Sequence, residues 1–148
     1  MRRIALSFLI LFSVLSCAHP APKVERLHIE GTSLVNESGE VVELKGMSFG
    51  WNVLWPRFYN AGAVGHIVDD WGAEVVRAAI GVEIDDNECQ VKNYLHNPEF
   101  GKQCACTIVD AAIENGVYVL VDWHAHGLHT EAAVEFFTYM ASKYKGVP

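Results

Sequence analysis

The stretch GVYVLVDWHAH, residues 116–126, decides the fold of this chain. Residues 117–123 are almost continuously apolar, which is typical of a strand that is covered on both faces of a parallel sheet. The run ends at an acid and an indole, and His124, His126 and His129 follow within six positions. Because α/β folds carry their working residues at the carboxyl ends of parallel strands, the stretch predicts a strand and a site together.

A regular alternation of strands and helices surrounds this stretch. Its apolar patterns predict strands at residues 45–49, 74–80 and 117–123, and helices at residues 61–71, 104–115 and 131–144. Asn60 is the expected N-cap of the first helix, and Gly116 the expected stop of the second. The order indicates a parallel sheet with crossover helices, and three such strands look like the front of a longer α/β protein.

The residues before the first of these strands predict a leader and a β-hairpin. MRRIALSFLILFSVLSCAHP has two arginines, an apolar run too short to span a bilayer and then small residues, which is the pattern of a signal peptide over residues 1–18. In the alternative, a bacterial lipobox ends the signal before Cys17, which would carry a lipid anchor. Residues 19–26 form a short mature leader. Residues 27–44 predict the hairpin, with a turn at residues 36–39 where Gly39 supplies positive φ.

Charge and cysteines restrict the partners. The formal net charge of −7, with no basic cluster after the leader, argues against nucleic acid and favours neutral partners such as sugars. In an exported chain, Cys89 is expected to form a disulfide with Cys104 or Cys106. The single-residue spacing of Cys104 and Cys106 is poor for zinc, and the sequence predicts no metal and no cofactor.

Candidate site residues follow each predicted strand. Trp51 and Trp55 come after the first strand, where aromatic faces stack on sugar rings or simply fill the core beneath a loop. Arg77, near the end of the second strand, either orients carboxylates or serves a structural ion pair. His124 should point into the site, and the pair His124-x-His126 also has the zinc-binding spacing of metal-dependent amidohydrolases.

Four segments, in order and spacing, resemble one family: LKGMSFGWNVLW, DDWGAEVVRAAIGVE, GVYVLVDWHAH and EAAVEFFTYMASKYKGVP. They are similar to the amino-terminal part of glycoside hydrolase family 5, in particular to its bacterial-type endo-β-1,4-glucanases. The resemblance implies an α/β fold, a partial (β/α)8 TIM barrel with an amino-terminal β-hairpin plus the first three β/α units. Residues 27–148 would be the amino-terminal part of the catalytic domain, truncated before the fourth strand.

The same resemblance assigns roles. Arg77 matches an arginine that hydrogen-bonds the nucleophilic carboxylate, and His124 matches a histidine that lines the cleft. Trp55 matches an aromatic residue that stacks on a glucose unit. The resemblance puts His126 near the cleft without a fixed role; His126 and Trp51, the latter from its aromatic character alone, are further candidates for substrate binding. The segment Ser48-Phe49-Gly50 departs from the family, because many relatives have a histidine there.

The catalytic acids are expected elsewhere. A retaining glycosidase needs an acid/base and a nucleophile carboxylate, which the resemblance puts on the fourth and seventh strands, beyond Pro148. Asp122 is expected below the site, and Glu83, Asp85 and Asp86 are expected at a solvated rim; none is assigned to catalysis.

The sequence therefore predicts a fragment of a secreted endoglucanase (cellulase) that cleaves internal β-1,4 bonds of cellulose or a related β-glucan with retention. The fragment itself is expected to be inactive, and the full-length protein to be a monomer. Outer-membrane anchoring as a lipoprotein is the alternative location. The alternative functions are a non-catalytic sugar-binding remnant and an amidohydrolase-like metal-dependent barrel.

Overall fold

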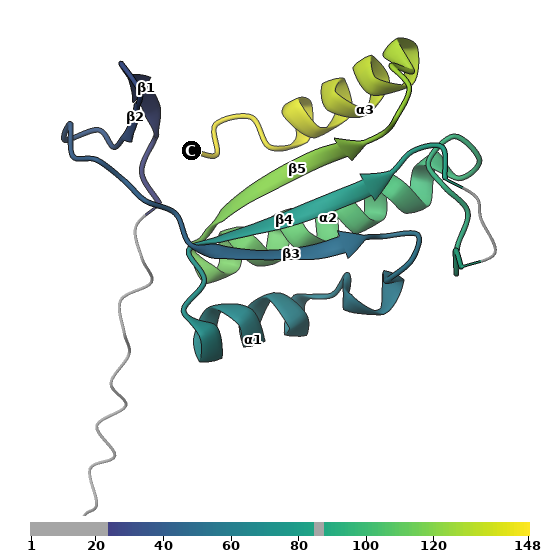
Figure 1. Ribbon diagram of the computed structural model, residues 1–148, viewed down its shortest axis with the longest axis horizontal. Coiled ribbons are helices and arrows are strands. Elements are labelled where there is room, and N and C mark those ends of the chain that lie inside the picture. The colour runs from purple at the N-terminus through teal and green to yellow at the C-terminus, as the bar shows by residue number, and fades with distance from the viewer. Residues whose placement is uncertain (1–23, 85–87) are drawn as a thin grey trace, which may run out of the picture.

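The computed structural model describes residues 24–84 and 88–148 (Figure 1). The signal-peptide and lipobox predictions, together with Asp85 and Asp86, lie outside this part. The elements are β1 (His28–Glu30), β2 (Ser33–Val35), β3 (Gly46–Trp51), the 3₁₀ turn η1 (Pro56–Phe58), α1 (Ala61–Trp71), β4 (Val75–Gly81), α2 (Pro98–Asn115), β5 (Tyr118–His124) and α3 (Thr130–Lys143).

The main sheet has the order β3-β4-β5, and both pairings are parallel. In Figure 1, α2 lies behind β4, while α1 and α3 flank it along the outer edges of β3 and β5. The core fills the space between the sheet and these helices; Ile80, Ile108 and Phe136 are fully buried in it. The predicted alternation of three parallel strands and three helices is confirmed.

The helix ends follow local chemistry. The Asn60 side chain accepts a hydrogen bond from Ala63 N at 2.9 Å, and Gly116 ends α2 in the left-handed region at φ 64°, as predicted. However, α2 begins at Pro98 rather than at residue 104. Asn97 caps it by accepting from Phe100 N, and a proline at the first helical position has no N–H to leave unpaired.

The hairpin is also built differently from the prediction. β1 and β2 pair antiparallel through a turn at residues 31–32, where Gly31 has φ 62°. The predicted turn at residues 36–39 forms as well, with Gly39 at φ 79°, but only an isolated bridge between Val35 and Val41 follows it. This second arm is therefore shorter than its apolar pattern suggested.

The expected disulfide is wrong. Cys104 and Cys106 of α2 are both free thiols buried in the core, so neither is bonded to Cys89. Burial raises the pKa of the Cys104 thiol to about 11, although the Asn52 side chain opposes this shift. Both behave as small apolar residues, and Cys106 packs against α3, where its Sγ lies 3.7 Å from Tyr139 Oη and 4.0 Å from Met140 Sδ.

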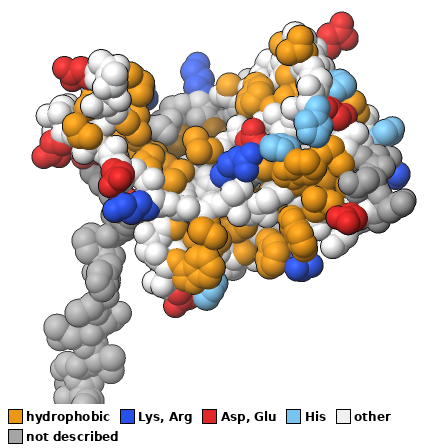
Figure 2. Space-filling view, viewed as in Figure 1, with side chains coloured by type: hydrophobic (Ala, Val, Ile, Leu, Met, Phe, Trp, Pro, Cys, Tyr) orange, Lys and Arg blue, Asp and Glu red, His pale blue; other side chains and the backbone are white. Residues whose placement is uncertain are grey.

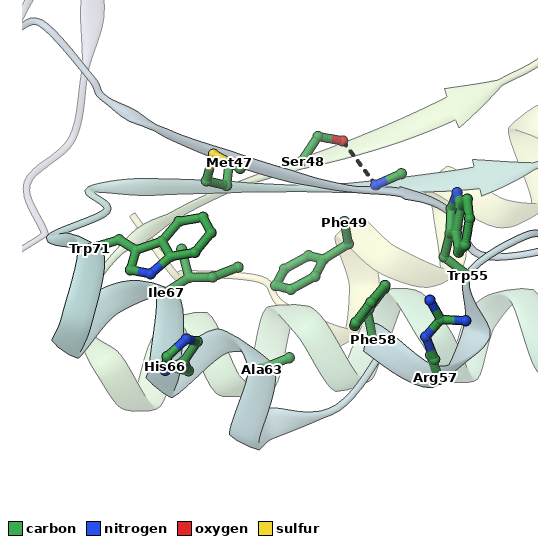
Figure 3. Close-up of a pocket in the computed structure, with 11 residues that line it drawn as sticks. Met47, Ser48, Phe49, Trp55, Arg57, Phe58, Ala63, His66, Ile67 and Trp71 are labelled. Carbon is green, nitrogen blue, oxygen red and sulfur yellow. Dashed lines mark hydrogen bonds between the residues drawn. The ribbon is translucent and has the colours of Figure 1, made fainter.

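The outer edge of β3 is apolar. Between β3 and α1 runs an open groove of about 640 Å³, toward which Phe49, Phe58, Ile67 and Trp71 point (Figure 3). Figure 2 shows hydrophobic side chains gathered along this side of the molecule. Within residues 24–84 and 88–148, no helix is both long and apolar enough to cross a bilayer.

Candidate active site

The register of the sheet gathers polar side chains on the face turned away from the helices. Alternate residues of β4, such as Val76 and Ile80, are buried in the core, so Arg77 between them projects from the opposite face. In β5, Asp122 pairs with Ala79 and His124 with Gly81, which puts both on the same face as Arg77. The site thus lies on this face, toward the carboxyl ends of the strands.

Arg77 is held from both sides. Its Nη1 donates to Ser48 Oγ on β3 at 3.0 Å, and its Nη2 donates to Asp122 Oδ2 on β5 at 2.6 Å. The guanidinium is therefore fixed by the two strands that flank its own. Asp122, which the sequence placed below the site, is a member of it. Ser48, which stands where many relatives have a histidine, uses its hydroxyl to orient the arginine.

The geometry also assigns the proton on the His124 ring. His124 Nδ1 lies 2.8 Å from Asp122 Oδ2 and 3.1 Å from Arg77 Nη2. A carboxylate and an unprotonated nitrogen would repel each other at this distance, so Nδ1 carries the proton and donates to Asp122. Arg77 Nη2 and His124 Nδ1 are then both donors, and they lie close together because both bind the same oxygen of Asp122. In the neutral ring, Nε2 remains as an acceptor for a substrate hydroxyl.

A β-bulge directs Trp51 into the site. Ser48 pairs with Arg77, but Trp51 pairs with Ala79, so β3 carries one extra residue between these points. Without it, alternation would send Trp51 to the helix side with Phe49. Gly50 makes the bulge, with φ 69°, and Trp51 stacks on His124 with ring centroids 4.4 Å apart. Gly50, the residue that directly follows the predicted strand at residues 45–49, was the signal that could have revealed this bulge.

Two buried polar side chains secure the bulge. The Tyr59 hydroxyl lies 2.6 Å from the carbonyl oxygen of Gly50 and 2.8 Å from that of Ala79, so its proton is shared between them. Burial raises the pKa of Tyr59 far above its usual range, which keeps this donor protonated. Next to the bulge, Asn52 Oδ1 accepts from Gly81 N at 2.8 Å.

A carboxylate joins the loops after β4 and β5. Glu83 Oε1 accepts from the N–H groups of His126 and Gly127, and Oε2 lies 2.7 Å from His129 Nε2. The expectation of a solvated charge was wrong for Glu83, and His129 is its partner. This pairing has no local sequence signal, because more than 40 residues separate the two loops.

The predicted site residues divide into two groups. Arg77, His124, Trp51 and His126 come together on one face, with the His126 ring edge-on to Trp51 at 6.2 Å. Arg77 is the third residue of β4, not near its end as predicted, and its long side chain reaches His124 at the end of β5. Trp55 instead lines the groove between β3 and α1, where Arg57 lies over its ring at a distance of 5.1 Å (Figure 3). Its place as a sugar platform therefore stays a prediction.

Comparison with known proteins identifies the family. Residues 35–148 match the model of the family described as cellulase (glycosyl hydrolase family 5). The chain belongs to glycoside hydrolase family 5. Endoglucanase Z of Dickeya dadantii is 34% identical over 131 residues, which are 84% of this chain and 29% of that enzyme. The chain thus spans less than a third of this curated relative.

Solved structures of the family share the fold. A structure from Cytophaga hutchinsonii superposes with a TM-score of 0.76 at 39% identity, and covers 83% of this chain and 39% of its own. The catalytic domain of a Thermobifida fusca endoglucanase, a variant in complex with cellotetraose, superposes with a TM-score of 0.71 at 26% identity; the match covers 81% and 39% of the two chains. The predicted partial (β/α)8 barrel, a hairpin plus three β/α units, is confirmed.

Membership of family 5 also argues against the alternative of an amidohydrolase-like metal-dependent barrel. The pair His124 and His126 does not converge on one point: His124 Nδ1 is bonded to Asp122, whereas His126 Nδ1 lies 3.6 Å from Glu83 Oε1. In the described part of the chain, no group of three or more His, Cys, Asp and Glu side chains is arranged to hold a metal ion.

Proposed function

We propose that residues 27–148 are the amino-terminal part, before the fourth strand, of the catalytic domain of an endo-β-1,4-glucanase. The enzyme would cleave internal bonds of cellulose or a related β-glucan with retention, without metal or cofactor, and act as a monomer. The observation that carries the proposal is the fixed Arg77–Asp122–His124 network beside Trp51, in a chain of family 5. The relative crystallised with cellotetraose supports a β-glucan as substrate.

In this proposal Arg77 binds the nucleophilic carboxylate. A guanidinium has five N–H donors, and the described contacts to Ser48 and Asp122 leave others for an acid from a later strand. That acid attacks the anomeric carbon while a second carboxyl group protonates the leaving oxygen, so that a covalent glycosyl-enzyme forms. Because Asp122 and Ser48 already orient Arg77, little reorganisation is needed as charge moves off the nucleophile.

His124, Trp51 and Trp55 would bind the sugar. The free Nε2 of His124 would accept a hydrogen bond from a substrate hydroxyl, and an indole face of Trp51 would pack on the apolar C–H face of a ring. His126, farther out on the loop after β5, would contact the substrate at the edge of the cleft. Trp55 would serve a more distant glucose unit.

The decisive experiment compares the full-length protein with residues 27–148. We expect the full-length protein to release reducing sugar from carboxymethylcellulose with retention at the anomeric carbon, and its Arg77→Ala variant to lose this activity. Residues 27–148 should release none, because the carboxylate pair is expected beyond Pro148. Hydrolysis by the short chain, or inversion by the full-length protein, would refute the proposal.

A second function, sugar binding without hydrolysis, is favoured by one observation. Trp51, His124 and His126 form their contiguous set of rings entirely within this chain. If residues 27–148 bind cellotetraose in calorimetry and Trp51→Ala abolishes the binding, while the full-length protein hydrolyses nothing, then a sugar-binding remnant is the better description.

The location is proposed as secreted, from the signal-peptide pattern of residues 1–18. The lipobox alternative predicts a different location, because lipidation at Cys17 would retain the protein in the outer membrane. Fractionation of cells that express the protein and its Cys17→Ala variant separates the two: release of the variant but not of the wild type would show the anchor.

A further inference from the structure

The loop after β5, residues 125–129, is tied to the rest of the barrel by one side chain. Glu83, two residues past the end of β4, accepts two backbone hydrogen bonds from this β5 loop and contacts the ring of a third residue. Oε1 accepts from both the His126 and the Gly127 backbone N–H groups, the latter at 2.8 Å, and Oε2 lies 2.7 Å from His129 Nε2. A single carboxylate thus fixes the loop at both its middle and its end.

The β5 loop has a shape that needs such support. His129 has φ 41°, in the left-handed region that a residue with a side chain rarely occupies. Its ring packs over Gly127: a Cβ atom added there would lie 2.9 Å from His129 Nε2. The contact between His129 Nε2 and Glu83 Oε2 holds the ring in this position, and Gly127 provides the room that the ring requires.

The β5 loop carries the outermost ring of the site. His126 has a side chain that is 73% exposed, and it stands edge-on to Trp51, whose other contact is the His124 ring. The rings of His124, Trp51 and His126 therefore form a continuous wall from the Arg77 network outward. Glu83 holds His126 there: its Oε1 accepts from the His126 backbone N–H and lies 3.6 Å from His126 Nδ1.

We propose that Glu83 is a positioning residue that holds the β5 loop so that His126 stands beside Trp51 as the outer wall of the substrate cleft, and thereby sets the affinity for extended β-glucan chains. The inference rests on the proposed glucanase function and deepens it. Glu83 is not a catalytic acid in this scheme, because Oε1 accepts two backbone N–H groups of the loop and Oε2 lies against the His129 ring.

The electrostatics of Glu83 agree with this role. Burial of the carboxylate raises its pKa, but the hydrogen bonds from the Gly127 and His126 N–H groups and the neighbouring His129 outweigh that effect, so the pKa lies below its usual value of 4.5. Glu83 is therefore ionised near neutral pH and cannot donate a proton to a leaving group. A group of this kind fixes a loop but does not act as a general acid.

Kinetics of the full-length protein test the role. For Glu83→Ala we expect KM for carboxymethylcellulose and the Kd for cellotetraose to rise about five-fold, the effect of losing roughly one good contact, with kcat changed less than about two-fold. Glu83→Gln, which keeps an oxygen for the two N–H groups but loses the His129 ion pair, should lie between. Glu114→Gln removes the same charge from the exposed face of α2 and should match the wild type. An equal loss in kcat, or no change in KM and Kd, overturns the proposal.

An NMR titration separates the clamp from the enzyme claim. The Gly127 amide should shift with a midpoint below pH 4.5 as Glu83 is protonated, and this shift should be absent in Glu83→Gln. If the wild type binds cellotetraose but hydrolyses nothing, the proposed function fails. The Kd for cellotetraose and the NMR titration then still test whether Glu83 positions the loop. A Gly127 amide that does not respond, or titrates identically in Glu83→Gln, shows that the clamp does not form and overturns the inference.

Discussion

Arg77 Nη2 lies 2.6 Å from Asp122 Oδ2, although 45 residues separate the two along the chain. Both side chains are about one-third exposed, so solvent screens the pair and its value to folding is modest. The pair matters more for the geometry of the site than for the free energy of unfolding. The one carboxylate oxygen receives both Arg77 and His124, and so it fixes the guanidinium and the imidazole relative to each other on adjacent strands.

Asp122→Asn in the full-length protein should lower kcat by roughly 10², a cost like that of one preorganised electrostatic contact, because Arg77 and His124 then face a neutral amide in place of the carboxylate that orients them. The thermal midpoint should move little. Asp69→Asn, an equal charge change on the exposed surface of α1, is the control. Steady-state kinetics with circular dichroism melts measure both effects, and an Asp122→Asn enzyme with wild-type kcat would contradict the network's role.

Gly50→Ala should destabilise the protein and reorient Trp51. The substitution costs about 1–2 kcal/mol for a residue with a side chain at positive φ, and its Cβ would also meet Trp55 Cδ1 at 2.9 Å. Gly39→Ala is the matched control, since Gly39 has φ 79° with nothing within 4 Å. Urea unfolding and tryptophan fluorescence distinguish them: both lose stability, but only Gly50→Ala should change the native emission.

Tyr59→Phe should reduce stability by about 1–3 kcal/mol near neutral pH, because the carbonyl oxygens of Gly50 and Ala79 lose their buried donor. The raised pKa of Tyr59 adds a pH dependence. The folded state keeps the phenolic proton when the unfolded chain has lost it, so this stabilisation is complete below the usual pKa of 10.0 and declines at higher pH. Tyr59→Phe should therefore show a shallower alkaline loss in urea unfolding; an unchanged slope would argue against it.

Cys104 and Cys106 should resist alkylation in the native protein and react in denaturant without any reductant. Both thiols are buried, and at a pKa of about 11 little of Cys104 is the reactive thiolate at neutral pH. Peptide mapping after iodoacetamide treatment, with and without urea, measures this. Alkylation that requires a reductant would reveal a disulfide and contradict the free thiols.

Local sequence signals predicted the elements well. The cap of Asn60, the stop at Gly116 and the apolar run of β5 act over a few residues, so their structural meaning can be recognised without knowing the rest of the fold. The start of α2 was missed although Asn97-Pro98 is itself a local start signal. The disulfide was mispredicted because cysteine counting does not reveal which thiols a helix buries.

The site was predicted in part. The family resemblance put Arg77 and His124 in one site, and the structure brings them together, with His124 at the end of β5 but Arg77 in the first half of β4. The bulge at Gly50 was not predicted, because it exists only as a mismatch between β3 and β4, and one extra residue decides whether Trp51 faces the site or the helices.

By itself, the sequence determined which segments are strands and helices, and that their alternation makes a parallel sheet with its site at the carboxyl ends. Only the tertiary structure decided the contacts across it: Asp122 beneath both Arg77 and His124, Tyr59 against the bulge, and Glu83 on the β5 loop. The physical reason is the separation along the sequence over which each kind of interaction acts. Propensity, capping and periodicity act between near neighbours in sequence, whereas these hydrogen bonds depend on strand register, which is set by the packing of the whole sheet.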